Sequence, residues 1–159
     1  MKVIVLGCGR VGASLANSLT GHGHQVTVMD RDPKAFRLLG DDLIVEHPGE
    51  VAPPATGSGP PRATTVRQKI ACVLGLGIDE DVLRQAGIEN ADAFAAVTDS
   101  DYTNIMACLM AKKIFRVPRV IARISEPKRE KIFHGLGLET ICPATLGAKT
   151  VFELLVKAR

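Results

Sequence analysis

Short apolar runs alternate with amphipathic stretches along most of the chain. Runs that are apolar at successive positions are typical of strands buried on both faces of a parallel sheet. The stretches between them repeat apolar residues at helical spacing. Strands are expected at 3–6, 25–29, 70–74, 91–97, 119–124 and 139–142, and helices at 11–20, 33–39, 80–85, 102–114, 127–134 and 146–158. This alternation predicts an α/β fold, a doubly wound and mostly parallel six-stranded sheet with helices on both faces.

The last predicted helix is apolar over more than half of its circumference. Val151, Leu154 and Leu155 lie on one face, and Phe152 and Val156 form a second strip beside it. A helix of this kind needs a broad apolar surface to pack on. Two interpretations stay open: it packs on a second surface, or it closes the last crossover against the sheet.

The segment 47–66 departs from this pattern. Five of the nine prolines lie between Pro48 and Pro61, mixed with Gly, Ser, Ala and Thr. Such a composition supplies too little apolar area to offset the entropy of ordering the chain. We expect a Pro/Gly-rich surface loop inserted between the second helix and the third strand.

The clearest chemical motif is Gly7-x-Gly9-x-x-Gly12, which follows the first predicted strand and opens the first predicted helix. Gly7 permits a sharp turn, Gly9 lets a pyrophosphate approach the backbone, and Gly12 lets the helix pack close to the strand. The helix N-terminus offers free N–H groups and partial positive charge to a phosphate. In this context the motif predicts a Rossmann-type nucleotide-binding unit.

Charged residues near the glycines extend the prediction. Asp30 ends the second strand, 18 residues after Gly12, where a carboxylate accepts hydrogen bonds from both hydroxyls of an adenosine ribose. Its charge repels a 2′-phosphate, which favours NAD or a plain adenine nucleotide over NADP, although Arg31 next to it weakens that preference. Arg10 is either a bidentate phosphate ligand or a solvent-exposed helix residue.

Two further loops, 75–79 and 97–99, follow the third and fourth predicted strands. Open α/β sheets place their ligand crevice at the carboxyl ends of strands. Small residues in these loops suit an adenine or ribose pocket, and the alternative is that they only separate structural elements.

The composition excludes several classes of function. The chain has 159 residues, of which 46% are hydrophobic and 23% charged, and it contains no Trp and one Tyr. A net charge of +3 and scarce aromatic side chains argue against a nucleic-acid partner. The apolar runs are too short for membrane insertion. Four widely spaced cysteines indicate neither a disulfide framework nor a metal site, which fits a reduced, cytoplasmic setting.

Known catalytic signatures are absent from the sequence. There is no Tyr-x-x-x-Lys pair, no G-x-S-x-G, no H-E-x-x-H and no Walker loop. The sequence therefore favours a binding or regulatory protein that is not an enzyme.

Several longer marks are more specific than the glycine motif. They are Arg10 in the glycine loop, D-x-L-x-x-A-G-I at 81–88, A-x-T at 96–98 with Asn104, I-A-R at 121–123 and I-C-P at 141–143. With these marks the segments 2–36, 75–113 and 120–155 resemble the N-terminal nucleotide-binding domain of regulators of potassium conductance, the RCK or KTN domain. Such domains occur in cytoplasmic regulatory subunits of Trk- and Ktr-type potassium uptake systems.

The resemblance implies a ligand, a set of site residues and an assembly. The ligand is NAD(H) or ADP/ATP, and the protein forms homodimers or larger rings beneath a membrane potassium channel or transporter subunit. The residues implied are Gly7, Gly9, Arg10, Val11 and Gly12 for the phosphates, Asp30 and Arg31 for the ribose and adenine side, Asp79 near the adenine, and Thr98 and Arg123 for the far half of the ligand or a neighbouring protomer.

The sequence departs from the family pattern at two places. Leu76 stands where the family usually has an acidic residue, and the segment 47–66 is an insertion. The smaller C-terminal ligand-binding lobe of many members is not part of residues 1–159, so we expect a single domain, either a stand-alone regulator or an excised domain.

Three functions follow from these observations. The first is a nucleotide-sensing regulatory domain of a potassium transport system that gates its membrane partner through a rearrangement of the dimer. The second is a small NAD-dependent oxidoreductase, for which Thr98, Asp99 and Tyr102 are the candidate acid or base groups. The third is a structural interaction domain that has lost its ligand.

Overall fold

One parallel sheet organises the chain, and its strand order reverses at the first strand. The computed structural model describes residues 1–40, 43–44 and 70–157. The sheet runs in the order β3-β4-β2-β1-β5-β6-β7, and every pairing is parallel. The strands are β1 (Lys2–Leu6), β2 (Gln25–Asp30), β3 (Leu43–Ile44), β4 (Ile70–Leu74), β5 (Ala93–Ala96), β6 (Arg119–Arg123) and β7 (Glu139–Ile141).

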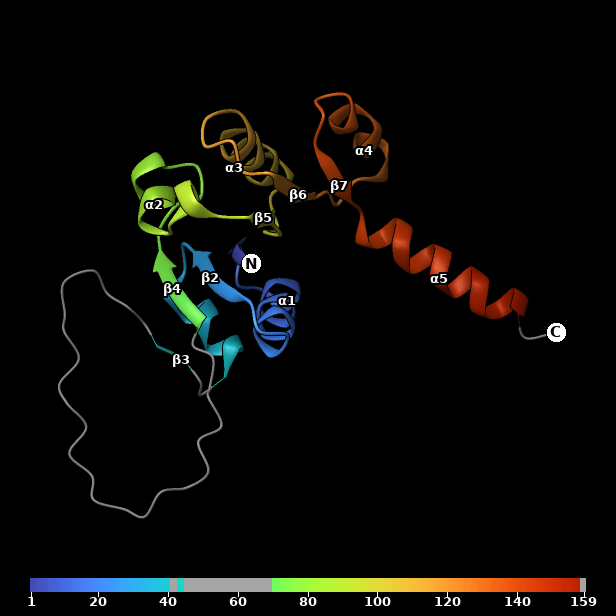
Figure 1. Cartoon of the computed structure of the whole chain (residues 1–159). Coiled ribbons are helices and arrows are strands. Elements are labelled where there is room, and N and C mark those ends of the chain that lie inside the picture. The colour runs from blue at the N-terminus through green and yellow to red at the C-terminus, as the bar shows by residue number, and fades with distance from the viewer. Residues whose placement is uncertain (41–42, 45–69, 158–159) are drawn as a thin grey trace, which may run out of the picture.

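Helices connect most of these strands on both faces of the sheet (Figure 1). Five are α-helices and two are short 3₁₀ helices within the described residues. They are α1 (Arg10–Gly21), η1 (Pro33–Leu39), α2 (Glu80–Gln85), η2 (Ile88–Asn90), α3 (Asp101–Lys113), α4 (Pro127–His134) and α5 (Pro143–Lys157). The predicted doubly wound α/β fold is confirmed.

The predicted and observed elements differ at a few places. All six predicted strands are present, and the two-residue β3 adds a seventh at the edge, paired with β4. The helix at 33–39 is a 3₁₀ helix, with Asp32 accepting a hydrogen bond from the Lys34 N–H at its start. The last helix begins at Pro143, three residues before the predicted start. The inserted segment 47–66 lies outside the described residues.

Two apolar clusters cover the two faces of the sheet, and β1 contributes to both. Val3 and Val5 belong to the cluster that includes Ala13 and Ala16 of α1. Ile4 and Leu6 belong to the other cluster, which α2 and α3 cover. This alternation along β1 follows the two-residue period of a strand buried on both sides.

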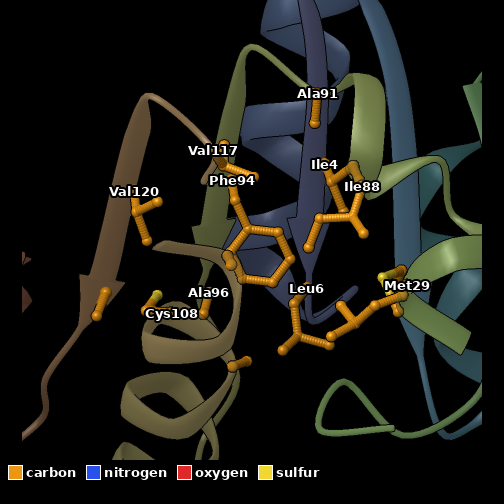
Figure 2. Packing of buried hydrophobic residues seen from close by; sticks show 14 of the residues in the cluster. Ile4, Leu6, Met29, Ile88, Ala91, Phe94, Ala96, Cys108, Val117 and Val120 are labelled. Carbon is orange, nitrogen blue, oxygen red and sulfur yellow. The ribbon is translucent and has the colours of Figure 1, made fainter. Parts of the chain in front are cut away.

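Phe94 of β5 lies at the centre of the second cluster. Its side chain is 1% exposed, and Figure 2 shows the ring among Ile4, Leu6 and Val117. Burying one such aromatic ring contributes about 2–3 kcal/mol to folding. The ring therefore helps to hold β5 beside β1, where the strand order reverses.

The last helix, α5, does not pack on the sheet. None of its residues is buried, and Figure 1 shows it extending away from the other elements. Leu154 and Leu155 are 67% and 73% exposed. Two interpretations of this helix were open. In the described part of the chain it does not close the last crossover against the sheet. Among the described residues, no helix is both long and apolar enough to cross a membrane.

Candidate functional site

The glycine loop forms the turn from β1 into α1, and packing requires glycine at two of its positions. Gly7 has φ of 100° and donates a backbone hydrogen bond of 2.7 Å to the Met29 carbonyl. A Cβ on Gly12 would lie 1.8 Å from the Gly7 carbonyl oxygen, far closer than two non-bonded atoms can approach. These two residues thus let α1 start directly against the end of β1.

Gly9 differs from the other two glycines because open space lies above it. A Cβ at Gly9 would meet no atom within 4 Å among the described residues. Gly9 is the N-cap residue of α1, and no side chain caps the helix there. The first N–H groups of α1 therefore point towards open space, an arrangement that favours an anion.

A cavity of about 580 Å³ occupies this space at the carboxyl ends of the central strands. That volume suits a small-molecule ligand. Its lining comes from the loops that follow β1, β2, β4, β5 and β6. The predicted site residues that line it are Gly7, Gly9, Arg10, Val11, Asp30, Arg31, Thr98 and Arg123.

Asp30 is half-buried and ties two loops together at one end of the cavity. Its Oδ2 accepts a hydrogen bond of 2.6 Å from the Cys8 N–H, and its Oδ1 accepts one of 2.9 Å from the Asp32 N–H. A carboxylate has about four acceptor positions, so each oxygen keeps capacity for a further donor. The carboxylate can accept ribose hydroxyls while it holds the glycine loop in place.

Thr98 and Arg123 line the cavity on the opposite side of β1 from Asp30. Nη1 of Arg123 donates a hydrogen bond to the Thr98 carbonyl oxygen, with 3.1 Å between the two atoms. The Thr98 hydroxyl donates to Oδ1 of Asn104 at 2.6 Å. Asn104 is fully buried, and sequence reasoning gave it no role in the site. Two signals could have indicated one: its place beside the A-x-T mark at 96–98, and its position one turn into α3 after a Ser100 cap.

Charges of both signs line the cavity. Three arginines and three aspartates contribute to the wall: Arg10, Arg31, Arg123, Asp30, Asp32 and Asp99. Arg10 lies at the α1 N-terminus and Arg123 ends β6, two strands from β1, so positive charge is available to anionic groups at both places. Within the described residues, no cluster of three or more His, Cys, Asp or Glu side chains could hold a metal ion.

Two predicted site residues are not part of the lining. Gly12 lies beneath the glycine loop and serves the close packing of α1. Asp79 is the N-cap residue of α2, where its Oδ1 accepts hydrogen bonds from the N–H groups of Asp81 and Val82. The requirement to cap α2 turns this carboxylate towards its own helix, so the loop before it lines the cavity through Gly75, Leu76, Gly77 and Ile78.

One end of the cavity has an aliphatic rim. Leu38, Leu76 and Ile78 line it and are 54%, 55% and 48% exposed. These side chains come from η1 and the loop after β4, the same side of β1 as Asp30. A flat apolar group bound there would cover them.

The cysteine inside the glycine loop is not a nucleophile. The pKa of the Cys8 thiol is raised to about 12, chiefly by burial and to a smaller extent by the neighbouring Cys72 and Asp30. Burial likewise raises the pKa of Cys72 to about 11. Both thiols therefore stay protonated at neutral pH and act as small apolar side chains of one core cluster, with Cys8 also lining the cavity.

A family model decides where the chain belongs. The model of the TrkA-N domain matches residues 3–51 and 60–143. The chain belongs to the TrkA-N domain family. This confirms the family resemblance drawn from the sequence.

Two curated relatives match almost the whole chain. The Trk system potassium uptake protein TrkA of Streptomyces coelicolor is 40% identical over 156 residues, which cover 98% of this chain and 59% of that protein. A TrkA homolog of Methanothermobacter thermautotrophicus is 30% identical over 156 residues, covering 98% of this chain and 60% of that protein. The chain thus spans about 60% of the length of these relatives.

Solved structures share the fold of this TrkA-N chain. The TrkA-N domain of the inner membrane protein ybaL from Escherichia coli has a TM-score of 0.73 at 18% identity, covering 97% of this chain and 96% of that chain. The GsuK channel bound to NAD has a TM-score of 0.67 at 22% identity, covering 97% of this chain and 23% of that chain. GsuK bound to ADP has a TM-score of 0.68 at 21% identity, covering 99% and 34%.

Proposed function

We propose that this TrkA-N chain is a nucleotide-sensing regulatory domain of a potassium transport system. The observation that carries the proposal is the cavity in which the glycine loop, the uncapped N-terminus of α1 and the Asp30 carboxylate meet. The ligand is an adenine nucleotide, either NAD(H) or ADP/ATP. Two structural neighbours, GsuK bound to NAD and GsuK bound to ADP, support this ligand class.

In this proposal the nucleotide lies across the sheet at the reversal of strand order. Its phosphates bind the N–H groups above Gly9 and the guanidinium of Arg10. The ribose hydroxyls bind Asp30, and the base lies against the aliphatic rim of Leu38, Leu76 and Ile78. Leu76 supplies apolar surface here, so the base is held by contact area more than by a side-chain carboxylate.

The regulatory role and the partner are proposed from the relatives. Curated proteins that match 98% of this chain are named as Trk system potassium uptake proteins, which supports a membrane transport subunit as partner and a cytoplasmic location beside it. The exposed apolar surface of α5 supports assembly into a homodimer or larger ring. Nucleotide binding then changes the geometry of the assembly, with a coupling of about 1–3 kcal/mol typical of such devices.

Of the three candidate acid or base groups for the oxidoreductase alternative, Asp99 lines the cavity, whereas the contacts of Thr98 and Tyr102 do not favour that role. The Thr98 hydroxyl is engaged with Asn104 and with the Ser100 backbone. Tyr102 does not line the cavity; it is 69% exposed, and the Arg129 guanidinium stacks on its ring. A hydride-transfer site needs a free acid or base group beside the reacting carbon, and these two groups do not supply one.

Calorimetric titration of the chain with AMP, ADP, ATP and NAD⁺ tests the proposal. We expect binding of at least one of these nucleotides, and a loss of about tenfold or more in affinity for the variant Arg10→Ala, the size expected for one hydrogen bond to a charged group. The matched control is Arg84→Ala, an arginine on α2 that pairs with Glu80 and Glu89 outside the cavity. Binding of none of the four nucleotides, or equal affinity of Arg10→Ala and the wild type, would refute the assignment.

A further inference from the structure

We infer that Asn104 is a positioning residue that holds Thr98 and Arg123 in place for the part of the ligand that extends beyond the first phosphate. The inference rests on the proposed nucleotide site and deepens it. Asn104 does not line the cavity. The inference is that it nevertheless affects which nucleotides bind tightly.

The Asn104 side chain uses its whole hydrogen-bonding capacity. Its Oδ1 accepts from the Thr98 N–H at 3.0 Å and from the Thr98 hydroxyl at 2.6 Å. Its Nδ2 donates to the Thr98 carbonyl at 3.1 Å and to the Arg123 carbonyl at 2.9 Å. A side-chain amide has two donors and two acceptor positions, and all four are engaged here inside the protein.

These four bonds join three elements at the mouth of the site. Asn104 belongs to α3, Thr98 follows β5, and Arg123 ends β6. Asn104 is 0% exposed, so its bonds do not compete with water and have a fixed geometry. Moving the amide would therefore move the ends of both strands.

Arg123 is the residue through which this network reaches a ligand. Its Nη1 is anchored on the Thr98 carbonyl at 3.1 Å, and Arg123 is one of the residues that line the cavity. Its Nε is buried and has no hydrogen-bond partner among the described residues. A buried, unpaired donor of a charged group is costly unless an acceptor binds it. Because Nε itself is buried, a ligand would meet the remaining Nη donors of the guanidinium, and an anionic or carbonyl oxygen is the acceptor that suits them.

The strand order determines which part of a nucleotide meets Arg123. Asp30 ends β2, on one side of β1, whereas Thr98 and Arg123 follow β5 and β6 on the other side. A nucleotide that binds its ribose at Asp30 and its first phosphate at α1 reaches Arg123 only if it continues past that phosphate. NAD⁺ continues in this way, and AMP does not. Asn104 should thus affect the affinity for NAD⁺ and leave the affinity for AMP almost unchanged.

The test compares NAD⁺ and AMP on the wild-type chain and on Asn104→Asp by calorimetric titration. The substituted carboxylate keeps the shape of the amide but replaces both donated hydrogen bonds with repulsion of two carbonyls. We expect the Kd for NAD⁺ to rise about tenfold or more, and the Kd for AMP to change less than about twofold.

The matched control is Cys108→Ala. Cys108 lies one turn further along α3, is fully buried, and donates its thiol to the Ile121 carbonyl of β6 at 3.4 Å. It joins the same helix to the same strand through a hydrogen bond that involves neither Thr98 nor Arg123. We expect this variant to lower Tm without changing the ratio of the NAD⁺ and AMP affinities, which separates positioning from a merely structural role.

The possible outcomes distinguish the inference from the proposed function. A wild-type chain that binds no adenine nucleotide overturns the proposed function, and the inference with it. A wild-type chain that binds AMP but not NAD⁺, or an Asn104→Asp variant that weakens both ligands equally, overturns the inference alone. If the variant does not fold, the ¹⁵N-labelled wild type decides: the Asn104 side-chain amide resonances must shift with NAD⁺ more than with AMP, and equal shifts count against the inference.

Discussion

The backbone N–H of Cys8 donates a hydrogen bond of 2.6 Å to the Asp30 carboxylate. The glycine loop is thus anchored on the same side chain that is placed to accept ribose hydroxyls. Because the other carboxylate oxygen accepts from the Asp32 N–H, one residue fixes the loops after both β1 and β2. Asp30 therefore shapes the cavity even when no ligand is present.

This double role predicts that Asp30→Ala affects both binding and stability. The substitution removes two hydrogen bonds to a half-buried carboxylate and frees the glycine loop. We expect nucleotide affinity to fall about 10- to 100-fold, since hydrogen bonds to charged groups contribute about 1.5–3 kcal/mol. Calorimetric titration and a thermal melt of the same sample measure the two effects. A variant that loses affinity while its Tm stays at the wild-type value would show that the carboxylate does not anchor the loop.

The two glycines of α1 should respond to alanine in opposite directions. At Gly12 the new Cβ would lie 1.8 Å from the Gly7 carbonyl oxygen, so the helix must move away from β1. We expect Gly12→Ala to cost about 3 kcal/mol or more of folding free energy. At Gly21 the new Cβ meets nothing within 4 Å, and we expect Gly21→Ala to be neutral or to stabilise by up to about 1 kcal/mol. Urea denaturation of both variants measures the difference, and equal destabilisation contradicts it.

The fold was predictable from local patterns because a parallel sheet buries each strand on both faces. The runs at 70–74 and 80–85 match β4 and α2 to the residue. The seventh strand, β3, could not be predicted, since two residues carry no periodicity and their pairing depends on the neighbouring β4. The apolar pattern of α5 predicted a helix. That pattern does not say which surface, if any, the helix packs on, because it describes the helix alone.

The candidate site was predictable where backbone geometry dictates the residue type. Glycine at positions 7 and 12 and a carboxylate at position 30 follow from the turn and from the end of β2. Asp79 could not be assigned from the sequence alone, because the same carboxylate suits a helix cap and a ligand, and its side chain caps α2. Asn104 was missed as a site residue because its role depends on β5 and β6 meeting at one place, which spacing along the chain does not express.

The exposed face of α5 predicts association between copies of the chain. Leu155 is 73% exposed and Phe152 is 65% exposed in the described structure, and a helix with this much apolar surface is stabilised when another surface covers it. We expect sedimentation equilibrium to show a concentration-dependent dimer or larger species. Leu155→Asp should weaken that association while changing the stability of the dilute monomer by less than about 0.5 kcal/mol. A wild-type chain that remains monomeric at high concentration would remove the support that α5 gives to assembly.

The buried thiols predict a loss of stability in alkali. Burial raises the pKa of Cys8 and Cys108 to about 12 and that of Cys72 to about 11, from an ordinary value of 9.0. Between these values the native chain retains protons that the unfolded chain releases, so raising the pH favours unfolding. We expect the free energy of unfolding, constant with respect to these thiols below pH 9, to fall by on the order of 1 kcal/mol per thiol for each pH unit above it. Urea denaturation under reducing conditions at several pH values measures the slope. Cys108→Ala removes one of the three thiols, so the fall in unfolding free energy per pH unit should be smaller by on the order of 1 kcal/mol. An unchanged slope in that variant would show that ionisation of Cys108 does not limit stability in this range.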